Sequence, residues 1–295
     1  MQSSQPLVSI VIPCYNHEQF VQDTIQSVID QTYNNIELII IDDGSKDSSV
    51  AKIKEMIELC ERRFTRFEFR SRANIGLSAT LNEALEWCQG VYLSCIASDD
   101  ILKAYKTSVQ VDYLQKNILS IGVFGGVELI DENAAVKGTI LRRHKKYNFN
   151  DIFLHQHNLP APTQFLRLNN VREVGGYKES LIIEDWPMWL FLTEHGGTLD
   201  YISTVFTSYR RHQGNLSARL DDMQKARIEV VELFSSNELS ERALAGTYMV
   251  EAHCWQKINR KKSLSFIKKA IKSDFTLIYK KSFLQYIIKL ALFQY

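Results

Sequence analysis

The stretch VYLSCIASDD at residues 91–100 places two adjacent carboxylates directly after an apolar run. The run from Val91 to Ile96 is typical of a buried strand, and Asp99 and Asp100 follow its carboxyl end. Neighbouring acids repel each other unless a cation or a proton relieves the repulsion, which favours a divalent-metal site beneath a diphosphate. Alternatively, an aspartate here caps a helix that begins at about Ile101, since Asp is favoured at that position. This stretch alone does not separate the two interpretations.

A second acidic segment, Asp42–Ser45 (DDGS), follows the apolar run IELIII at residues 36–41. The carboxylate of Asp42 could accept the imide hydrogen of a uracil, and Tyr15, which follows the apolar run at 7–12, could stack on the base. The same four residues are also ordinary turn formers, because Asp, Gly and Ser all favour turns. Both interpretations remain open at this point.

The elements that must position these acids alternate along the first hundred residues. Buried strands are expected at 7–12, 36–41, 67–70 and 91–96, and helices at 20–29, 48–60 and 77–87. This β-α-β-α-β-α-β order predicts a parallel sheet covered on both faces. Right-handed crossovers then place the loops that follow all four strands at one edge of the sheet. Ligands bind at that edge in open α/β sheets, which favours the metal interpretation over the cap.

Beyond residue 116 the pattern indicates a mixed sheet rather than a second doubly wound half. Strands are expected at 121–130, 135–141 and 198–208, with a polar loop at 142–150. From residue 222 onward every segment has a helical pattern. We therefore predict an α/β domain at 1–220 and a C-terminal helical region at 221–295. The motifs GxGxxG and GxxxxGK[ST] are absent, so neither a dinucleotide fold of the usual type nor a P-loop is supported.

Composition places the chain among globular proteins. Its 295 residues, 45% apolar and 11% aromatic, are enough for a sizeable core. The net charge of +1 implies no strongly charged partner, and no nucleic acid is expected. The five cysteines are odd in number and form no CxxC pair, as in a reduced cytosolic protein. The first residues do not resemble a signal peptide, and no uncharged apolar run reaches the ~20 residues of a membrane span.

Charge is distributed unevenly along the chain. Residues 257–295 contain ten Lys and Arg residues and one acid, whereas residues 1–256 contain 25 bases and 33 acids. Lys281, Gln285 and Lys289 recur at helical spacing, with an apolar face opposite them. A basic amphipathic helix predicts contact with an anionic membrane surface through residues 275–295. The alternative is a helix that packs on the α/β domain and exposes its basic face to solvent.

Six segments occur in an order that resembles the family 2 glycosyltransferases over roughly residues 6–218. They are VSIVIPCYN, IELIIIDDGSKDSS, NIGLSATLNEAL, GVYLSCIASDD, VGGYKESLIIEDWPMWL and YRRHQGNLS. The resemblance implies the GT-A fold and an inverting hexosyltransferase that uses a nucleotide sugar, expected to be a UDP-sugar. The implied acceptor is a saccharide, lipid-linked in many members, and the implied process is synthesis of a bacterial surface polysaccharide such as O-antigen or capsule. Such an enzyme is expected in the cytoplasm, peripherally bound at the inner face of the plasma membrane.

The resemblance also assigns residues to the donor nucleotide. Asp42 matches the acid that binds the nucleobase, and Pro13 and Tyr15 lie on the first nucleotide-binding loop. Asn74 matches the asparagine of an NxG element near the ribose and diphosphate. Asp99 matches an acid at the sugar or ribose, next to the metal.

A divalent cation, Mn²⁺ or Mg²⁺, is the cofactor that the resemblance implies. Asp100 matches the direct metal ligand of a DxD-type site, and His212 matches a histidine that many members place near the metal and diphosphate. Asp185 matches the general base of the ED motif, with Glu184 beside it. Asp185 is expected to begin an apolar helix that contains Trp186 and Trp189. Burial there would raise the pKa of Asp185 and a helix N-terminus would lower it, and the sequence does not decide that balance.

Two positions depart from the family pattern. Many members have DADD where this chain has Ala97–Asp100 (ASDD), so one acid is missing. Either one carboxylate suffices together with the diphosphate oxygens, or metal dependence is weak. Many members also have Arg-Asn where this chain has Leu81–Asn82, so a phosphate contact must come from elsewhere, such as Arg72, Arg210 or Arg211.

His155 and His157, in a loop on the expected acceptor side, are expected to be ordinary surface residues. Trp186 and Trp189 are expected in the core, with stacking on a sugar as the alternative.

Two other functions remain open on the sequence. A nucleotidyltransferase can share the α/β nucleotide core, although the ED and RRH segments argue against it. A catalytically silent sugar-nucleotide-binding module is the non-enzymatic alternative, which the missing acid keeps open.

Overall fold

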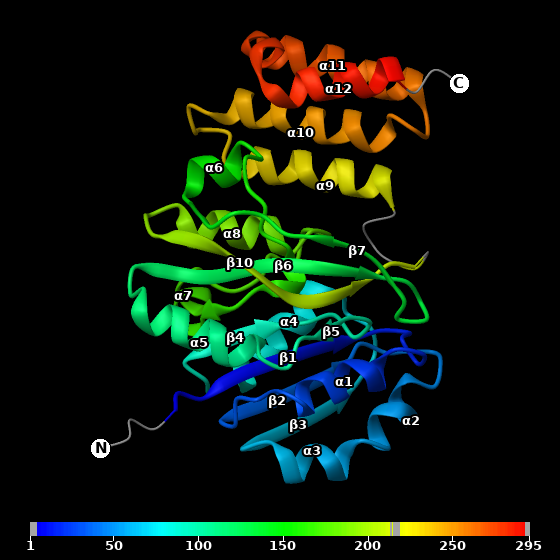
Figure 1. Cartoon of the computed structure of the whole chain (residues 1–295), viewed down its shortest axis with the longest axis vertical. Helices are drawn as coiled ribbons and strands as arrows, with labels where there is room; N and C mark the ends of the chain where they lie inside the picture. Colours follow the sequence, from blue (N-terminus) through cyan, green and yellow to red (C-terminus); the bar gives the residue numbers. More distant parts are fainter. Residues whose placement is uncertain (1–4, 213, 215–218, 293–295) are drawn as a thin grey trace. The chain divides into compact units, whose positions relative to one another are not determined.

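The computed structural model describes residues 5–212, 214 and 219–292 (Figure 1). The chain divides into two compact units, the first at 1–149, 158–180 and 187–213 and the second at 150–157, 181–186 and 214–295. The second unit thus combines the helical tail with two short segments from the middle of the chain. The domain limits at residues 220 and 221 stay a prediction.

A mixed sheet forms the centre of the first unit, and in the described ranges it has ten strands in the order β3-β2-β1-β4-β9-β6-β10-β5, with β7 on β6 and β8 on β10. The strands are β1 (Val8–Cys14), β2 (Ile36–Asp42), β3 (Arg66–Ser71), β4 (Tyr92–Cys95), β5 (Ile101–Leu102), β6 (Ser120–Ile130), β7 (Val136–Ile140), β8 (Lys145–Tyr147), β9 (Leu166–Arg167) and β10 (Thr198–Arg210). Strands β1, β2, β3 and β4 pair with one another in parallel. Strand β9 pairs with β4 in the antiparallel direction. The predicted parallel half and mixed second half of an α/β fold are both confirmed.

Helices flank this sheet in the first unit. They are α1 (Val21–Ile29), α2 (Ser49–Lys54), α3 (Ile57–Arg63), α4 (Leu77–Trp87), α5 (Lys106–Lys116), α7 (Leu168–Glu173) and the 3₁₀ turn η1 (Ala161–Thr163). Helices α6 (Phe149–Phe153) and α8 (Asp185–Thr193) contain residues of both units. The single helix expected at 48–60 is therefore two helices.

Two short strands contradict the expectations for residues 101 and 142–150. Ile101 begins β5 and not a helix, because β5 pairs antiparallel with β10 and the next helix begins at Lys106. The capping interpretation of Asp99 and Asp100 is therefore wrong. The segment expected to be a polar loop contains β8, which also pairs with β10. Both strands depend on a partner far away in the sequence, which no local pattern reveals.

Strand register brings the carboxyl ends of the first strands to one edge. Cys14 lies opposite Asp42, and Asp42 lies opposite Ser71. All seven residues of β2 are buried, so the strand is held from both faces. On one of those faces Val21, Ile25 and Val28 of α1 join the core of the first unit. Burial of this apolar surface contributes about 25 cal/mol of stabilising free energy per Å², and it fixes the strand ends at this edge of the sheet.

The second unit contains the helical tail that the sequence predicts. Its helices are α9 (Leu220–Leu233), α10 (Ser240–Trp255), α11 (Arg260–Ser273) and α12 (Lys281–Leu292), with the 3₁₀ turn η3 (Phe275–Tyr279) before α12. Ala252 of α10, Phe266 of α11 and Tyr286 of α12 share one core, so the three helices pack on one another (Figure 1). No helix in the described part of the chain combines the length and the apolar content needed to cross a membrane.

Candidate active site

The loop after β1 is fastened to the loop after β2. The N–H of Asn16 donates to Ser45 Oγ at 2.8 Å, and Lys46 N–H donates to Asn16 Oδ1 at 2.7 Å. Asn16 adopts φ +54°, a left-handed conformation that asparagine tolerates better than most residues. The next residue, His17, donates its N–H to Ser49 Oγ at 2.9 Å. These bonds fix the loop that carries the predicted nucleotide-binding residues.

Asp42 ends β2 and is fully buried. Its Oδ2 accepts hydrogen bonds from Ser45 N–H and from the Ser71 hydroxyl, both at 3.1 Å. Its Oδ1 has no hydrogen-bond partner among the described residues. Oδ2 therefore stabilises the turn, as one of the two interpretations from the sequence expected, and Oδ1 is available to a ligand. Tyr15 is 47% exposed, and Pro13 lies in β1.

Asp43 organises the loop that carries Asn74. Its carboxylate accepts the N–H groups of Ile75–Gly76 and pairs with Arg72, and Asn74 donates its side-chain amide to the Asp43 carbonyl at 2.8 Å. Gly44, at φ +74°, is required here, because a Cβ at that position would lie 2.6 Å from the Asn74 nitrogen. Asn74 is thus held at the sheet edge by the loop that follows β2.

Asp99 and His212 meet in the first unit. His212 Nε2 lies 2.8 Å from Asp99 Oδ2, which joins the end of β10 to the segment after β4. Asp100 is fully buried, and its Oδ1 accepts the N–H of Arg210 at 2.8 Å. Its Oδ2 has no hydrogen-bond partner among the described residues. Burial, and then the neighbouring Asp99, raise the pKa of Asp100 well above its usual range.

His17 is a functional candidate that the sequence reasoning missed. One ligand atom each from His17, Asp99 and His212 lie within 4.8 Å of one another. The ring of Phe20 lies 5.1 Å from that of His212 and 6.0 Å from that of His17. Burial lowers the pKa of His17, which favours the neutral imidazole that binds metals. Its place on the same loop as Tyr15, directly after β1, was the signal that could have found it.

Two of the three arginines considered for phosphate binding are used inside the protein. Arg72 donates to Glu83 and to Thr80 as well as pairing with Asp43. Arg210 is almost fully buried and donates to the backbone carbonyl of Asp99. Arg211 is exposed, so it is the better candidate of the three.

Asp185 lies in the second unit and begins α8, as the sequence predicts. Its Oδ1 accepts the N–H of Trp186 at 2.6 Å. Burial raises the pKa of Asp185, against the opposing effects of that N–H and of Arg227. Burial and the charge of Asp185 raise the pKa of Glu184 to about 8. Burial therefore outweighs the helix N-terminus, which the sequence left undecided.

His155 is not the ordinary surface residue that the sequence suggested. Its ring lies 4.1 Å from the ring of Trp186, and its Nε2 is 2.9 Å from the Thr247 hydroxyl of α10. Burial lowers the pKa of His155 well below its usual range. The prediction failed because α10 follows ninety residues later in the chain. Trp186 and Trp189 are buried, which confirms the core interpretation.

The sequence model of the family described as "Glycosyl transferase family 2" matches residues 9–174, more than half of the chain. An uncharacterized glycosyltransferase of Rickettsia conorii is 34% identical over an alignment of 199 residues that covers 62% of this chain and 30% of that protein. The chain thus spans less than a third of that relative's length.

Two relatives carry more specific names. The Escherichia coli UDP-Glc:alpha-D-GlcNAc-diphosphoundecaprenol beta-1,3-glucosyltransferase WfgD is 33% identical over 48% of this chain and 54% of its own length. The putative teichuronic acid biosynthesis glycosyltransferase TuaG of Bacillus subtilis is 28% identical over 74% of this chain and 84% of its own length. Both names concern the synthesis of glycans.

Solved structures share the fold at low sequence identity. S. aureus TarS in complex with UDP-GlcNAc has a TM-score of 0.67 at 14% identity, covering 90% of this chain and 81% of that one. The mannosyltransferase PcManGT from Pyrobaculum calidifontis, in complex with GDP-Man and Mn²⁺, has a TM-score of 0.58 at 11% identity, covering 98% and 87%. These likenesses place the chain in the GT-A fold.

Proposed function

Since this chain belongs to glycosyltransferase family 2, we propose that it transfers a sugar, with inversion, from a UDP-sugar to a hydroxyl of a saccharide acceptor. The supporting observation is the sheet edge of the first unit, where Asp42 keeps a buried carboxylate oxygen without a partner and Asp99 meets His212. The named relatives support a role in surface-polysaccharide synthesis.

The nucleotide side of the proposal rests on Asp42. Its Oδ1 can accept the imide N–H of uracil, while the exposed ring of Tyr15 offers a stacking surface on the neighbouring loop. Asn74, with Pro13 near the end of β1, lies at the same edge for the ribose and diphosphate. A carboxylate in this position favours a base that donates a hydrogen bond over one that only accepts.

Asp42→Asn is expected to weaken UDP binding by about 10–100-fold, because a hydrogen bond to a charged group contributes about 1.5–3 kcal/mol. Calorimetric titration of UDP, with GDP, CMP and TDP for comparison, measures this. Asp112→Asn, a change of an exposed acid elsewhere in the first unit, is the matched control. Unchanged UDP affinity in Asp42→Asn would contradict the base-binding role, and a preference of the wild type for GDP would contradict the assignment of uracil as the base.

The reaction needs a positive charge near the departing diphosphate and a base for the proton of the acceptor hydroxyl. The carboxylate of Asp99, the imidazole of His212 and the unpartnered Oδ2 of Asp100 suit a divalent cation, Mn²⁺ or Mg²⁺. Bound there, the cation would offset negative charge on the departing diphosphate. Asp185 would take the proton of the acceptor hydroxyl as it attacks the anomeric carbon. A single in-line displacement inverts that carbon.

The products separate this proposal from the two alternatives. A glycosyltransferase releases UDP in proportion to the sugar transferred, whereas a nucleotidyltransferase releases pyrophosphate from a nucleoside triphosphate. A silent module binds UDP and releases neither product with any acceptor.

We also propose that the acceptor is carried on a lipid and that α11, η3 and α12 bind the anionic inner face of the plasma membrane. The acceptor side is supported by the name of WfgD, which contains a diphosphoundecaprenol-linked sugar. Clustered cations near anionic lipid contribute about 1 kcal/mol each. The one acid of residues 257–295, Asp274, is buried and paired with Lys280, so it offsets one of the ten positive charges of this segment.

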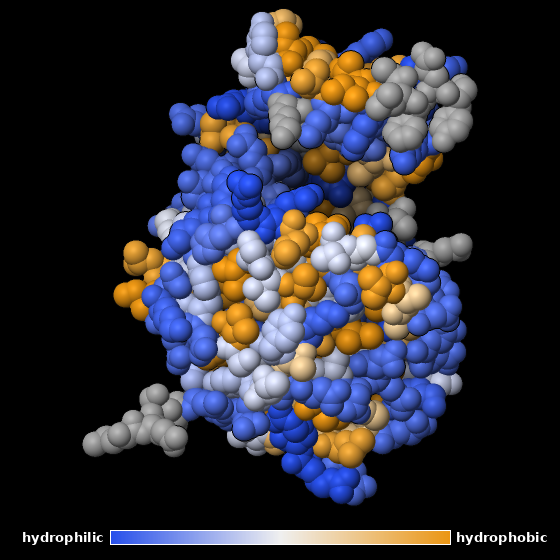
Figure 2. Space-filling view, in the orientation of Figure 1, coloured by the Kyte–Doolittle hydropathy of each residue, from blue (hydrophilic) through white to orange (hydrophobic). Residues whose placement is uncertain are grey.

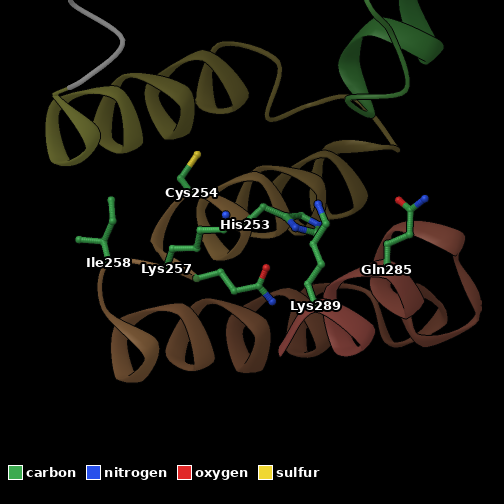
Figure 3. A pocket seen from close by; sticks show the side chains of 7 residues that line it. His253, Cys254, Lys257, Ile258, Gln285 and Lys289 are labelled. Atoms are coloured by element: carbon green, nitrogen blue, oxygen red, sulfur yellow. The ribbon is translucent and has the colours of Figure 1, made fainter. Parts of the chain in front are cut away.

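Apolar side chains accompany these cations at the surface of the helical tail. Phe275 and Tyr279 of η3 are 64% and 81% exposed, and Leu284, Ile287 and Ile288 of α12 are exposed as well. Figure 2 shows hydrophobic residues next to hydrophilic ones over α11 and α12. A hollow beside α10 and α12 adds further cationic side chains (Figure 3); it is lined by His253, Cys254, Gln256, Lys257, Ile258, Gln285 and Lys289. Exposed apolar side chains next to cations are typical of a surface that binds at the boundary between lipid head groups and acyl chains.

Replacing Phe275 and Tyr279 together by Ser is expected to weaken binding to phosphatidylglycerol-containing vesicles at least about tenfold, because both exposed rings lose their burial in lipid. Vesicle sedimentation measures the effect. The control replaces Ile118 and Leu119 by Ser, which are 79% and 81% exposed in the first unit. Equal binding of the two double variants, or binding that is the same for uncharged phosphatidylcholine vesicles, would contradict the proposal. Truncation after Asp274 is less informative, since it removes the core residue Tyr286.

A further inference from the structure

We infer that His17 is a protein ligand of the divalent cation in this site, alongside Asp99 and His212. The inference rests on the proposed metal-assisted transfer and adds a residue that no motif assigned. One ligand atom from each of the three side chains lies within 4.8 Å of the others, although the residues come from three distant parts of the chain. Three such atoms at this spacing need only small side-chain movements to reach one ion.

Ser98 holds the His17 ring in a suitable orientation. The Ser98 hydroxyl lies 2.8 Å from His17 Nδ1. The tautomer that donates from Nδ1 to this hydroxyl leaves Nε2 with a free lone pair. Metal-binding histidines commonly donate their other ring N–H to a fixed acceptor in this way. Ser98 is therefore a positioning residue, and it stands directly before Asp99.

The backbone around His17 is also fixed before any ligand binds. His17 N–H donates to Ser49 Oγ at 2.9 Å, and Glu18 N–H donates to Asp47 Oδ2 at 3.0 Å. The ring of Phe20 packs beside both imidazoles. A ligand on a loop held in this way loses little conformational entropy on binding a metal.

His17 would compensate for the acid that is missing from the segment Ala97–Asp100. The segment lacks the first acid of the DADD pattern, and the third metal-binding side chain comes from the loop after β1 instead. With His17 and His212 beside the carboxylates of Asp99 and Asp100, the site has more nitrogen than the oxygen-only sites that Mg²⁺ prefers. We therefore expect the protein to prefer Mn²⁺ to Mg²⁺ more strongly than a carboxylate site would.

Titration of Mn²⁺ and, separately, of Mg²⁺ into the full chain with saturating UDP tests the inference, with calorimetry and the electron paramagnetic resonance of free Mn²⁺ as readouts. The variants are His17→Gln, which removes the ligand, and His17→Asp, which replaces nitrogen by oxygen. Ser98→Ala removes the positioning hydroxyl, and His195→Gln makes the same change at an exposed histidine as a control.

His17→Gln is expected to lower Mn²⁺ affinity more than tenfold, and Ser98→Ala about tenfold, the lower end of the effects of outer-shell changes. His17→Asp is expected to keep cation binding and to reduce the preference for Mn²⁺ over Mg²⁺. Wild-type Mn²⁺ affinity in His17→Gln would overturn the role of His17 while leaving the proposed metal site intact. Equal losses of affinity for both ions in His17→Gln and His17→Asp would also overturn it, by showing a purely structural role. A wild type that binds neither ion would instead overturn metal assistance itself.

Discussion

Asp185→Asn is expected to lower the rate of sugar transfer by about 10²–10⁴-fold while leaving UDP affinity nearly unchanged, because a positioned general base contributes a factor of that size. Asn keeps the shape of the side chain and can still accept the Trp186 N–H bond that begins α8. What it loses is the capacity to take a proton. Rates of UDP release with acceptor, together with calorimetric UDP affinity, measure the two effects separately.

Glu184→Gln is the matched control for this prediction. Because burial and Asp185 raise the pKa of Glu184 to about 8, its carboxyl group is protonated at pH 7 and a neutral Gln resembles it. Transfer by Glu184→Gln at pH 7 should therefore remain close to that of the wild type. In the wild type the rate should rise with pH, since only ionised Asp185 accepts a proton, and its raised pKa moves that rise above the range of an ordinary aspartate. A fully active Asp185→Asn would remove Asp185 as the base, and an inactive Glu184→Gln would show that the loss in Asp185→Asn is not specific to that carboxylate.

Asp99→Asn is the second change with a large expected effect. We expect it to abolish the gain in UDP affinity that Mn²⁺ provides, since it removes the carboxylate that meets His212. The loss should exceed the roughly 10–100-fold that changes outside the direct ligands cost. Titrating UDP with and without Mn²⁺, on the wild type and the variant, measures it.

Asp100→Asn makes the same chemical change one residue further along. Asp100 Oδ1 is bound to the Arg210 backbone, so only its Oδ2 could serve a cation, and we expect a smaller loss than in Asp99→Asn. The opposite order, a loss in Asp100→Asn and none in Asp99→Asn, would restore the assignment made from the sequence. Mn²⁺-independent UDP binding in all three proteins would argue against any metal in the site.

Much of the fold was predictable because its first half is built from local patterns. Apolar runs of strand length alternate with helical spacing up to residue 96, and right-handed crossovers then bring the loops after the strands to one edge. Asp42, Asn74 and Asp99 could be chosen from that rule and from the order of six motifs. The start of α8 at Asp185 also followed from its position before an apolar run.

Other features depend on parts of the chain that meet only in the tertiary structure. Strand β5 forms because β10 lies beside it, and His155 is covered by α10. The one sequence signal for His17, its place just after Tyr15, is weak, since a single histidine after a strand is usually a surface residue. Its importance appears only when β10 delivers His212 and the segment after β4 delivers Asp99 to the same point.

The sequence by itself therefore determined the family, the parallel half of the sheet and the edge at which the chemistry is expected. Only the tertiary structure decided which atoms at that edge face one another: Asp99 toward His212, Asp100 toward the Arg210 backbone, and His17 toward Ser98. The physical reason is that periodicity reports which face of an element is buried, whereas a hydrogen bond or a ligand set requires atoms placed to within a few tenths of an ångström. That placement depends on packing between distant segments, which the order of residues along the chain does not encode locally.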